Sequence, residues 1–281
     1  MLATRHKLLL ARLASAPIRG LRRALGLGDE VEVWRAGFRW GLDLREGIDV
    51  AIYLLGSFER STVKAYRRLV GSGDVVLDIG ANIGAHSLFL ARFVGSAGRV
   101  VCFEPTAYAF DKLRRNVGLN PSLAGRTSLE RIMLAASRDA ALAPRLYSSW
   151  PLETSDDLHI RHGGRARSTA GARVTTLDTY LEERALPRVN FVKIDVDGNE
   201  CEVLAGGTDM LRIHRPKIVL ELAPYVLEER GRSVEDLLEP LAATGYRLVD
   251  PSSGRDLPMR GAEWRRRVPP GGSVNVVARA D

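Results

Sequence analysis

The segment Val75-Val-Leu-Asp-Ile-Gly-Ala-Asn-Ile-Gly84 decides the fold of this 281-residue chain. A short apolar strand ends around Asp78, and a turn containing Gly80 and Gly84 leads into a mostly apolar helix. Glycines in such a turn let the backbone approach a ligand that side chains would exclude. In open α/β sheets, ligands bind beyond the carboxyl ends of such strands. The segment therefore predicts a ligand-binding turn at the edge of a parallel sheet.

The spacing within this turn distinguishes between two kinds of ligand. A dinucleotide-binding turn has the pattern Gly-x-Gly-x-x-Gly, in which backbone amides hold a pyrophosphate at a helix terminus. Here Asn82 stands in place of the middle glycine, and the final gap is short. Asp78 would repel a pyrophosphate but attract a ligand that carries an ammonium group. We therefore predict that Asp78, Gly80, Asn82 and Gly84 bind a cofactor other than a dinucleotide.

A second acidic residue, Glu104, stands at the end of the next predicted strand. A carboxylate at this position can accept hydrogen bonds from the ribose hydroxyls of an adenosine group. Pro105 follows it, ends the strand and fixes the turn. Glu104 and Pro105 thus complete the predicted cofactor-binding set.

A third cluster of polar residues follows the strand that begins at Phe191. Asp195 ends this strand, and Asp197 and Glu200 crowd the turn into the next helix. Three acids this close together are costly unless a cation, a ligand or an arginine uses them. Asp195 would orient or deprotonate a nucleophilic hydroxyl, with Asp197 and Glu200 on the substrate side. Two alternatives are a divalent metal bound by carboxylate oxygens and simple capping of the following helix.

Two further residues are candidates for the substrate side of the site. Glu221 ends a later strand and is expected at the same rim of the sheet. His86 opens the helix after the glycine turn, where an imidazole could carry a proton, although a lone histidine is more often polar lining.

Strands and helices alternate after residue 71, which is typical of a parallel sheet covered on both faces. We predict a doubly wound α/β domain with a seven-stranded, mostly parallel sheet. Its strands are predicted at 75–79, 99–103, 129–136, 191–194, 217–222, 246–249 and 274–278.

The rest of the chain forms an extension and two predicted loops. Residues 1–70 are expected to form a basic helix followed by a hairpin-like segment over 30–55, whereas 71–281 form the main domain. Residues 147–173 and 251–272 are rich in Gly, Ser and Arg and are expected to be surface loops. The first loop carries Trp150, His159 and His162 and is expected to cover the substrate.

The net charge of +7 is concentrated in residues 1–27, which hold six Arg or Lys residues and no acid. A basic amphipathic helix of this kind would contact an anionic membrane face or a partner. The interpretation that we favour is a surface helix packing on its own domain. The remainder of the chain is nearly neutral and has no aromatic-rich basic motif, which argues against nucleic acid as a partner.

The sequence also indicates the compartment. No apolar run approaches the roughly 20 residues of a membrane span. The apolar core at 8–11 is too short for a signal peptide. Cys102 and Cys201 both fall in predicted regular elements, as expected of reduced, buried thiols. These observations predict a cytoplasmic protein.

Taken together, the motifs resemble the FkbM family of methyltransferases over roughly residues 40–279. The glycine turn of the family stands here as 77–84, its acidic second motif as 103–105, and its later signature as Val-Lys-Ile-Asp-Val-Asp-Gly at 192–198. Two positions depart from the family. Asp197 replaces a more usual Glu, and His86-Ser87 replaces a more typical aromatic-Thr pair.

The resemblance implies a Rossmann-like class I methyltransferase domain whose last strand is antiparallel. It implies S-adenosyl-L-methionine as the donor, and a sugar, glycolipid or polyketide hydroxyl as the small-molecule acceptor. The alternatives are a cofactor-binding protein without catalysis, a nicotinamide-dependent oxidoreductase, which the missing glycine disfavours, and an RNA-binding methyltransferase-like module.

Overall fold

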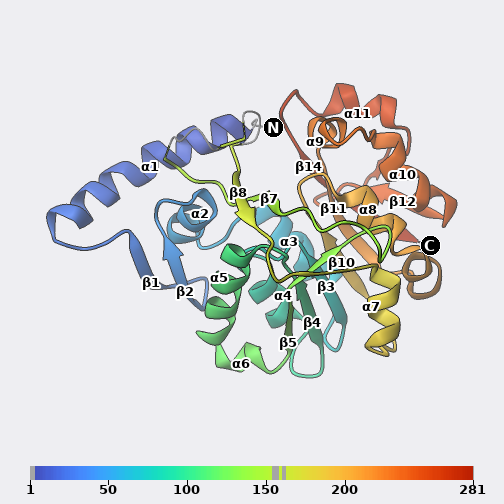
Figure 1. The fold of residues 1–281 in the computed structure, drawn as a ribbon, viewed down its shortest axis with the longest axis horizontal. Helices are drawn as coiled ribbons and strands as arrows, with labels where there is room; N and C mark the ends of the chain where they lie inside the picture. The colour runs from blue at the N-terminus through green and yellow to red at the C-terminus, as the bar shows by residue number, and fades with distance from the viewer. Residues whose placement is uncertain (1–3, 154–157, 160–162, 281) are drawn as a thin grey trace.

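The computed structural model describes residues 4–153, 158–159 and 163–280. Its centre is an eight-stranded sheet in the order β13-β12-β14-β11-β10-β3-β4-β5 (Figure 1). The bounds of these strands are β3 Val75–Ile79, β4 Arg99–Phe103, β5 Thr127–Glu130, β10 Phe191–Ile194, β11 Lys217–Leu222, β12 Tyr246–Val249, β13 Asp256–Leu257 and β14 Val274–Ala280. The prediction of a doubly wound, mostly parallel sheet is confirmed, and β13 adds a two-residue edge strand to the seven predicted.

The order of the strands places the chemistry at one edge of the sheet. β10 lies between β3 and β11, and all three run parallel. β14 runs antiparallel to β11 and β12, as the family resemblance implies. Because parallel strands end at the same edge, the residues that follow β3, β4, β10 and β11 lie close together there.

Helices cover both faces of the sheet, and each face has its own hydrophobic core. On one face the core contains side chains from α7, α8, α10 and α11; on the other it contains side chains from α2 to α5. The helices are α1 Thr4–Ala24, α2 Gly47–Leu55, α3 Arg60–Leu69, α4 Ser87–Phe93, α5 Ala107–Gly118, α6 Pro121–Ala124, α7 Leu177–Glu183, α8 Glu200–Ala205, α9 Pro224–Glu229, α10 Val234–Ala243 and α11 Gly261–Arg267, with a π-helix at Met210–His214.

The predicted hairpin-like segment over 30–55 is correct only in its first half. β1 Glu30–Arg35 and β2 Phe38–Asp43 pair antiparallel around Ala36-Gly37. The second half is α2, whose apolar side chains join the core beneath α3 and α4.

Three other segments also differ from the prediction. The strand predicted over 129–136 divides at Arg131 into β5, in the main sheet, and β6 Ile132–Leu134, which pairs with β9 Arg173–Thr175. The segment 147–173 is not a bare loop, because it contains most of the hairpin of β7 Arg145–Ser148 and β8 Arg165–Ser168. The segment 251–272 contains β13 and α11, and the buried Trp264 anchors α11 to the core.

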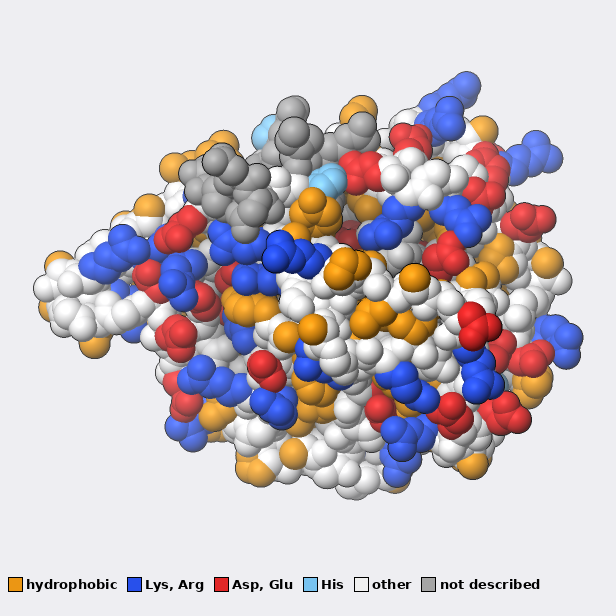
Figure 2. Space-filling view, in the orientation of Figure 1, with side chains coloured by type: hydrophobic (Ala, Val, Ile, Leu, Met, Phe, Trp, Pro, Cys, Tyr) orange, Lys and Arg blue, Asp and Glu red, His pale blue; other side chains and the backbone are white. Residues whose placement is uncertain are grey.

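Helix α1 extends along one side of the molecule beside α2 (Figure 1). Leu8, Ala11 and Ile18 pack against the core, and Arg19 pairs with Asp29 at 3.0 Å. These contacts agree with packing of the arm on its own domain. On the face shown in Figure 2, basic and acidic side chains are interspersed. Among the described residues, no helix is long and apolar enough to cross a membrane.

Candidate active site

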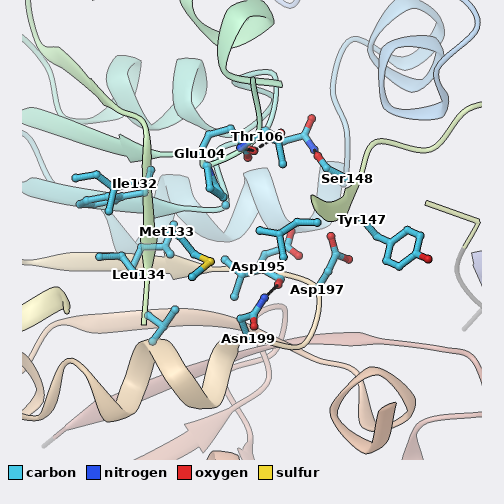
Figure 3. Close-up of a pocket in the computed structure, with 18 residues that line it drawn as sticks. Glu104, Thr106, Ile132, Met133, Leu134, Tyr147, Ser148, Asp195, Asp197 and Asn199 are labelled. Atoms are coloured by element: carbon cyan, nitrogen blue, oxygen red, sulfur yellow. Dashed lines mark hydrogen bonds between the residues drawn. The ribbon is translucent and has the colours of Figure 1, made fainter. Parts of the chain in front are cut away.

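A narrow pocket of about 70 Å³ opens where β3, β4 and β10 end (Figure 3). Met133 and Leu134 lie on one side of it and Tyr147 on the other, with Asp195 and Asp197 between them. Six of the predicted site residues line this pocket: Gly80, Asn82, Glu104, Pro105, Asp195 and Asp197. Five do not: Asp78, Gly84, His86, Glu200 and Glu221.

The glycine turn is shaped by close contact with the neighbouring strand as well as by room for a ligand. Gly80 has a φ of +79°, and a Cβ built there would lie 1.8 Å from the carbonyl oxygen of Asp195. Asn82 also has a positive φ, of +48°, a conformation that Asn tolerates better than most residues. Gly84 has a φ of +89° and faces Leu113, away from the pocket. The turn therefore places Asn82 at the pocket and Gly80 against β10.

Glu104 is buried at the pocket wall and is held by the turn beside it. One carboxylate oxygen accepts hydrogen bonds from the Thr106 amide and hydroxyl, at 2.9 and 2.6 Å. The other accepts one from the Asn82 amide at 3.0 Å. Burial raises the pKa of Glu104, and these hydrogen bonds oppose that rise. The carboxylate is thus fixed in place, with lone pairs left for donors inside the pocket.

Asp78 lies behind the pocket wall rather than in it. Its Oδ2 accepts a 2.6 Å hydrogen bond from Ser87, and its Oδ1 lies 3.5 Å from Nζ of Lys193. Lys193 also donates to the carbonyl oxygens of Ile79 and Gly80, at 3.2 and 2.6 Å. Its Nζ is 3.6 Å from Asp195 Oδ2, so one buried lysine joins the strand ends of β3 and β10.

The charge of Lys193 is set by its surroundings. Burial lowers the pKa of the Lys193 ammonium, but the carboxylates of Asp195, Asp78 and Glu59 outweigh burial and hold the pKa above its usual value. Lys193 is therefore a fixed positive charge beside the Asp78 and Asp195 carboxylates.

The acidic turn after β10 divides into residues with different tasks. The side chain of Asp195 is 30% exposed and faces the pocket. Asp197 has a φ of +50°, and burial together with Asp195 and Glu200 raises its pKa to about 8. Glu200 is buried, and its Oε1 accepts hydrogen bonds from the amides of Val196 and Gly198 at 3.0 and 3.3 Å. Glu200 thus shapes the turn, whereas Asp195 and Asp197 are available to a ligand.

The metal alternative concerns how the acidic side chains of this turn are grouped. In the parts of the chain that the structure describes, no three or more His, Cys, Asp or Glu side chains are grouped to hold a metal ion. The amides of the turn already occupy Glu200, one of the three acids that the alternative required.

Glu221 and His86 both lie near Glu59, the residue that precedes α3. The His86 Nε2 is 4.0 Å from Glu59 Oε2, and neither imidazole nitrogen has a hydrogen-bond partner. Burial and Lys193 lower the pKa of His86, which favours its neutral form. Burial, then Asp195 and Glu59, raise the pKa of Glu221 well above its usual range. Glu59 and Asp195 thus influence both groups, although neither His86 nor Glu221 lines the pocket.

Lys193 and Glu59 were not predicted from the sequence. A lysine within an apolar strand, as in Phe-Val-Lys-Ile-Asp at 191–195, is a signal of a buried charge, because lysine is rarely buried without a partner. Glu59 gives no such signal, since it precedes a helix as an ordinary capping residue would.

The predicted substrate-covering segment 147–173 is placed in part. Tyr147 and Ser148 line the pocket, and Ser148 accepts a 3.4 Å hydrogen bond from the Asn82 side chain. Trp150 lies farther out against Phe58, with ring centroids 5.5 Å apart. His159 lies 3.4 Å from Glu229, and His162 lies outside the described residues.

The sequence model of a protein family, the methyltransferase FkbM domain, matches residues 78–248, which is more than half of the chain. The chain belongs to the FkbM methyltransferase family. The matched range begins at Asp78 and includes both the glycine turn and the acidic turn after β10. S-adenosylmethionine is therefore the cofactor assigned to the chain.

Several characterised members of the family are similar in sequence. The hexuronic acid methyltransferase AglP of Haloferax volcanii is 29% identical over 64% of this chain and 62% of its own length. The 31-O-demethyl-FK506 methyltransferase FkbM of Streptomyces tacrolimicus is 30% identical over 49% of this chain and 60% of its own length. The chain thus spans about three-fifths of the length of these curated relatives.

The solved structure of the O-methyltransferase from Bacillus cereus in complex with SAH is similar to the structure of this FkbM family member. The sequences are 18% identical, with a TM-score of 0.45, and the alignment covers 80% of this chain and 83% of the other.

The donor set of the pocket fits S-adenosylmethionine. Glu104 offers anionic acceptors for hydroxyl groups, while Ile79, Phe103, Ile132 and Leu134 give the same pocket an apolar surface suited to a purine. The acidic turn offers Asp195 to a cationic group, a role that the sequence had suggested for Asp78. The fully buried Oδ1 of Asp78 lacks a hydrogen-bond partner and faces Lys193 instead.

Proposed function

We propose that this chain is an O-methyltransferase that uses S-adenosylmethionine to methylate a hydroxyl group of a small molecule. The observation that carries the proposal is that Glu104, Asn82 and Asp195 line a single pocket. Hydroxyl acceptors and an acidic group for a cationic ligand thus lie within one cavity. The names of the two relatives, which refer to a hexuronic acid and to O-demethyl-FK506, support a sugar, glycolipid or polyketide acceptor.

Glu104 and Asn82 would hold the adenosine part of the cofactor. Glu104 is already fixed by Thr106 and Asn82, so little side-chain entropy is lost when it accepts ribose hydroxyls. Gly80 contributes by close packing on β10, which keeps the turn in register with Asp195. Asp78 contributes indirectly, because it holds Lys193 in place.

Asp195 would act on the acceptor. When bound, S-adenosylmethionine supplies a methyl group that is already activated, so the protein has to orient the acceptor oxygen and remove its proton. Asp195 is partly exposed in the pocket, and its Oδ2 lies 3.6 Å from the Lys193 ammonium, where a carboxylate can accept a proton from the acceptor. The proton passes from the acceptor hydroxyl to a carboxylate oxygen of Asp195 and from there to solvent.

The test is transfer of labelled methyl groups from S-adenosylmethionine to a panel of glycosides, glycolipids and polyketides. Asp195→Asn is compared with the native protein and with Asp209→Asn, an exposed aspartate remote from the pocket. We expect Asp195→Asn to lower kcat by roughly 10²–10⁴-fold while the affinity for S-adenosylhomocysteine is retained. Asp209→Asn should behave as native.

Two results would count against this assignment. Unchanged turnover in Asp195→Asn would remove the proposed role of Asp195. Binding of S-adenosylhomocysteine without transfer to any hydroxyl in the panel would instead favour a binding protein that retains the cofactor pocket.

A further inference from the structure

A second, larger cavity of about 790 Å³ lies between the N-terminal helices and the carboxyl end of β11 and its neighbour β14. It differs from the cofactor pocket in position, size and lining. Helices α1 and α2, the start of α3, and the segments 250–252 and 273–275 form its walls. Its volume lies within the range of roughly 300–1,000 Å³ that is typical of small-molecule sites.

The lining of this cavity changes from apolar at the mouth to polar at the inner end. At the mouth, Leu10, Leu54 and Leu55 are 56%, 43% and 56% exposed, so about half of each side chain is in contact with solvent. The walls are formed mainly by Ala, Val and Leu side chains of α1 and α2, with Phe58 and Trp150. Exposed leucines around an apolar cavity are typical of a site that receives an apolar group.

The inner end is polar and is built from three hydrogen-bonded side chains. Glu59 Oε2 accepts hydrogen bonds from Asn275 Nδ2 at 2.7 Å and from Thr62 Oγ1 at 3.2 Å. Asn275 Nδ2 also donates to Thr62 Oγ1 at 3.0 Å. All three residues line the cavity, so this hydrogen-bonded group forms part of its polar lining.

This polar end connects the cavity with the candidate active site. Asn275 on β14 stands directly opposite Glu221 on β11 in the strand register. Glu59 lies 4.0 Å from His86, and its charge, together with that of Asp195, raises the pKa values of Glu221 and Lys193. Phe58 packs between Trp150 and His86, at ring distances of 5.5 and 5.9 Å. Glu59, which lines the cavity, and Asp195, which lines the cofactor pocket, thus both act on Glu221 and Lys193.

We propose that this cavity binds the apolar part of an amphiphilic acceptor, whose hydroxyl-bearing head lies at the Glu59–Asn275 end. The proposal rests on the proposed function and makes it more specific. A free sugar would leave the walls between α1 and α2 in contact with water, whereas an alkyl or polyketide chain would cover them. The head group would then lie next to Glu59, whose charge acts on Glu221 together with that of Asp195.

The experiment compares two probes that share a head group and differ only in chain length. The binding of n-octyl β-D-glucopyranoside, kept below its micelle concentration, and of methyl β-D-glucopyranoside is measured by calorimetry in the presence of S-adenosylhomocysteine. Each additional buried CH₂ contributes about 0.8 kcal/mol, so we expect the octyl probe to bind at least about tenfold more tightly.

Two variants fill the cavity and one serves as a matched control. Ala14→Trp places a large side chain in the wall formed by α1, and Ala51→Trp does so in the wall formed by α2. Ala16→Trp makes the same change at an exposed position of α1 that does not line the cavity. We expect both filling variants to lose at least about tenfold in affinity for the octyl probe, and the control to match the native protein.

The outcomes separate this proposal from the proposed function. Equal affinity for both probes, or full octyl binding by both filling variants, would overturn the proposal even if S-adenosylhomocysteine binds normally. Failure to bind S-adenosylhomocysteine would instead refute the proposed function. Unchanged affinity for S-adenosylhomocysteine in Ala14→Trp and Ala51→Trp, with the octyl affinity lost, supports the assignment of the cavity.

Discussion

The carbonyl oxygen of Asp195 lies so close to Gly80 that a Cβ on this glycine would be 1.8 Å from it. The glycine turn and the candidate catalytic strand are therefore in direct backbone contact. Nζ of Lys193 reinforces this contact, because it donates to the Gly80 carbonyl and lies 3.6 Å from the Asp195 carboxylate. The glycine turn and Asp195, the proposed acceptor-side acid, are thus held together by backbone contact and by one lysine.

Substitution of Gly80 tests this contact. We expect Gly80→Ala to reduce the free energy of unfolding by at least about 3 kcal/mol, because the strain of a positive φ adds to a backbone clash. Gly73→Ala is the matched control, since Gly73 has a φ of +88° but a Cβ added to it would meet nothing within 4 Å. Gly73→Ala should reduce the free energy of unfolding by only about 1–2 kcal/mol. Equal losses in urea denaturation would contradict the contact.

Removal of the buried lysine tests its role as a counter-charge. Lys193→Met leaves Asp78 and Asp195 without their shared cation, which should cost about 3–5 kcal/mol of unfolding free energy. Lys64→Met, on the exposed side of α3, should change it by no more than about 0.5 kcal/mol. Because the pKa of Lys193 is raised in the folded state, its stabilising contribution is complete below the unfolded value of 10.5 and decreases as pH rises further. Urea denaturation at neutral and alkaline pH measures both effects.

The pKa of about 8 for Asp197 predicts that replacing this side chain stabilises the protein in a pH-dependent way. Between 3.8 and about 8 the unfolded chain has lost this proton while the folded protein keeps it, so stability falls as pH rises. Asp197→Asn removes this loss, and Asn tolerates the positive φ. The free energy of unfolding of the variant should exceed that of the native protein by roughly 1–3 kcal/mol near pH 8, after allowance for solvent screening. Near about pH 4 the difference should be small.

The control for this prediction is Asp139→Asn, at an exposed position far from the acidic turn. Its difference from the native protein should not vary with pH. Thermal or urea unfolding across the range measures the trend. If the difference in unfolding free energy between Asp197→Asn and the native protein stays constant from acid to alkaline pH, the raised pKa of Asp197 is contradicted.

Glu104 is predicted to be essential for cofactor affinity. Glu104→Gln removes the charge and replaces one acceptor by a donor, so the affinity for S-adenosylhomocysteine should fall at least about tenfold. Thr106→Val removes only a hydrogen bond to Glu104 and should have a smaller effect. Calorimetric titration gives both affinities. An unchanged dissociation constant in Glu104→Gln would mean that this carboxylate does not touch the cofactor.

The sequence was most informative where short patterns impose strong physical constraints. The strand–glycine–helix segment at 75–84 and the acid ending β4 predicted the central strands, and six of the predicted site residues line one pocket. Glycines at positive φ and apolar strands are local signals, so they can be recognised without knowledge of tertiary contacts.

The errors came from elements whose conformation depends on contacts distant in the sequence. Ile48, Val50 and Ile52 alternate along the sequence as they would in a strand. The segment is nevertheless the helix α2, and all three side chains are buried in the core that α2 shares with the sheet. The helix α11 is held by Trp264, which packs on the core and donates to the Pro258 carbonyl. Such packing overrides local pattern.

The same reason explains the site residues that were misplaced or missed. Asp78 shares a face of β3 with Val76, so it points beneath α4 toward Ser87 and not into the pocket. Glu59 is hydrogen-bonded to Asn275 of β14, which is 216 residues away in the sequence. No short motif encodes a contact of that kind.

The most direct test of the account is a calorimetric titration of the native protein with S-adenosylhomocysteine and, separately, with NAD. The pocket that combines Glu104 with the acidic turn predicts saturable one-to-one binding of S-adenosylhomocysteine and no binding of NAD. Binding of NAD together with no response to S-adenosylhomocysteine or S-adenosylmethionine would contradict the account.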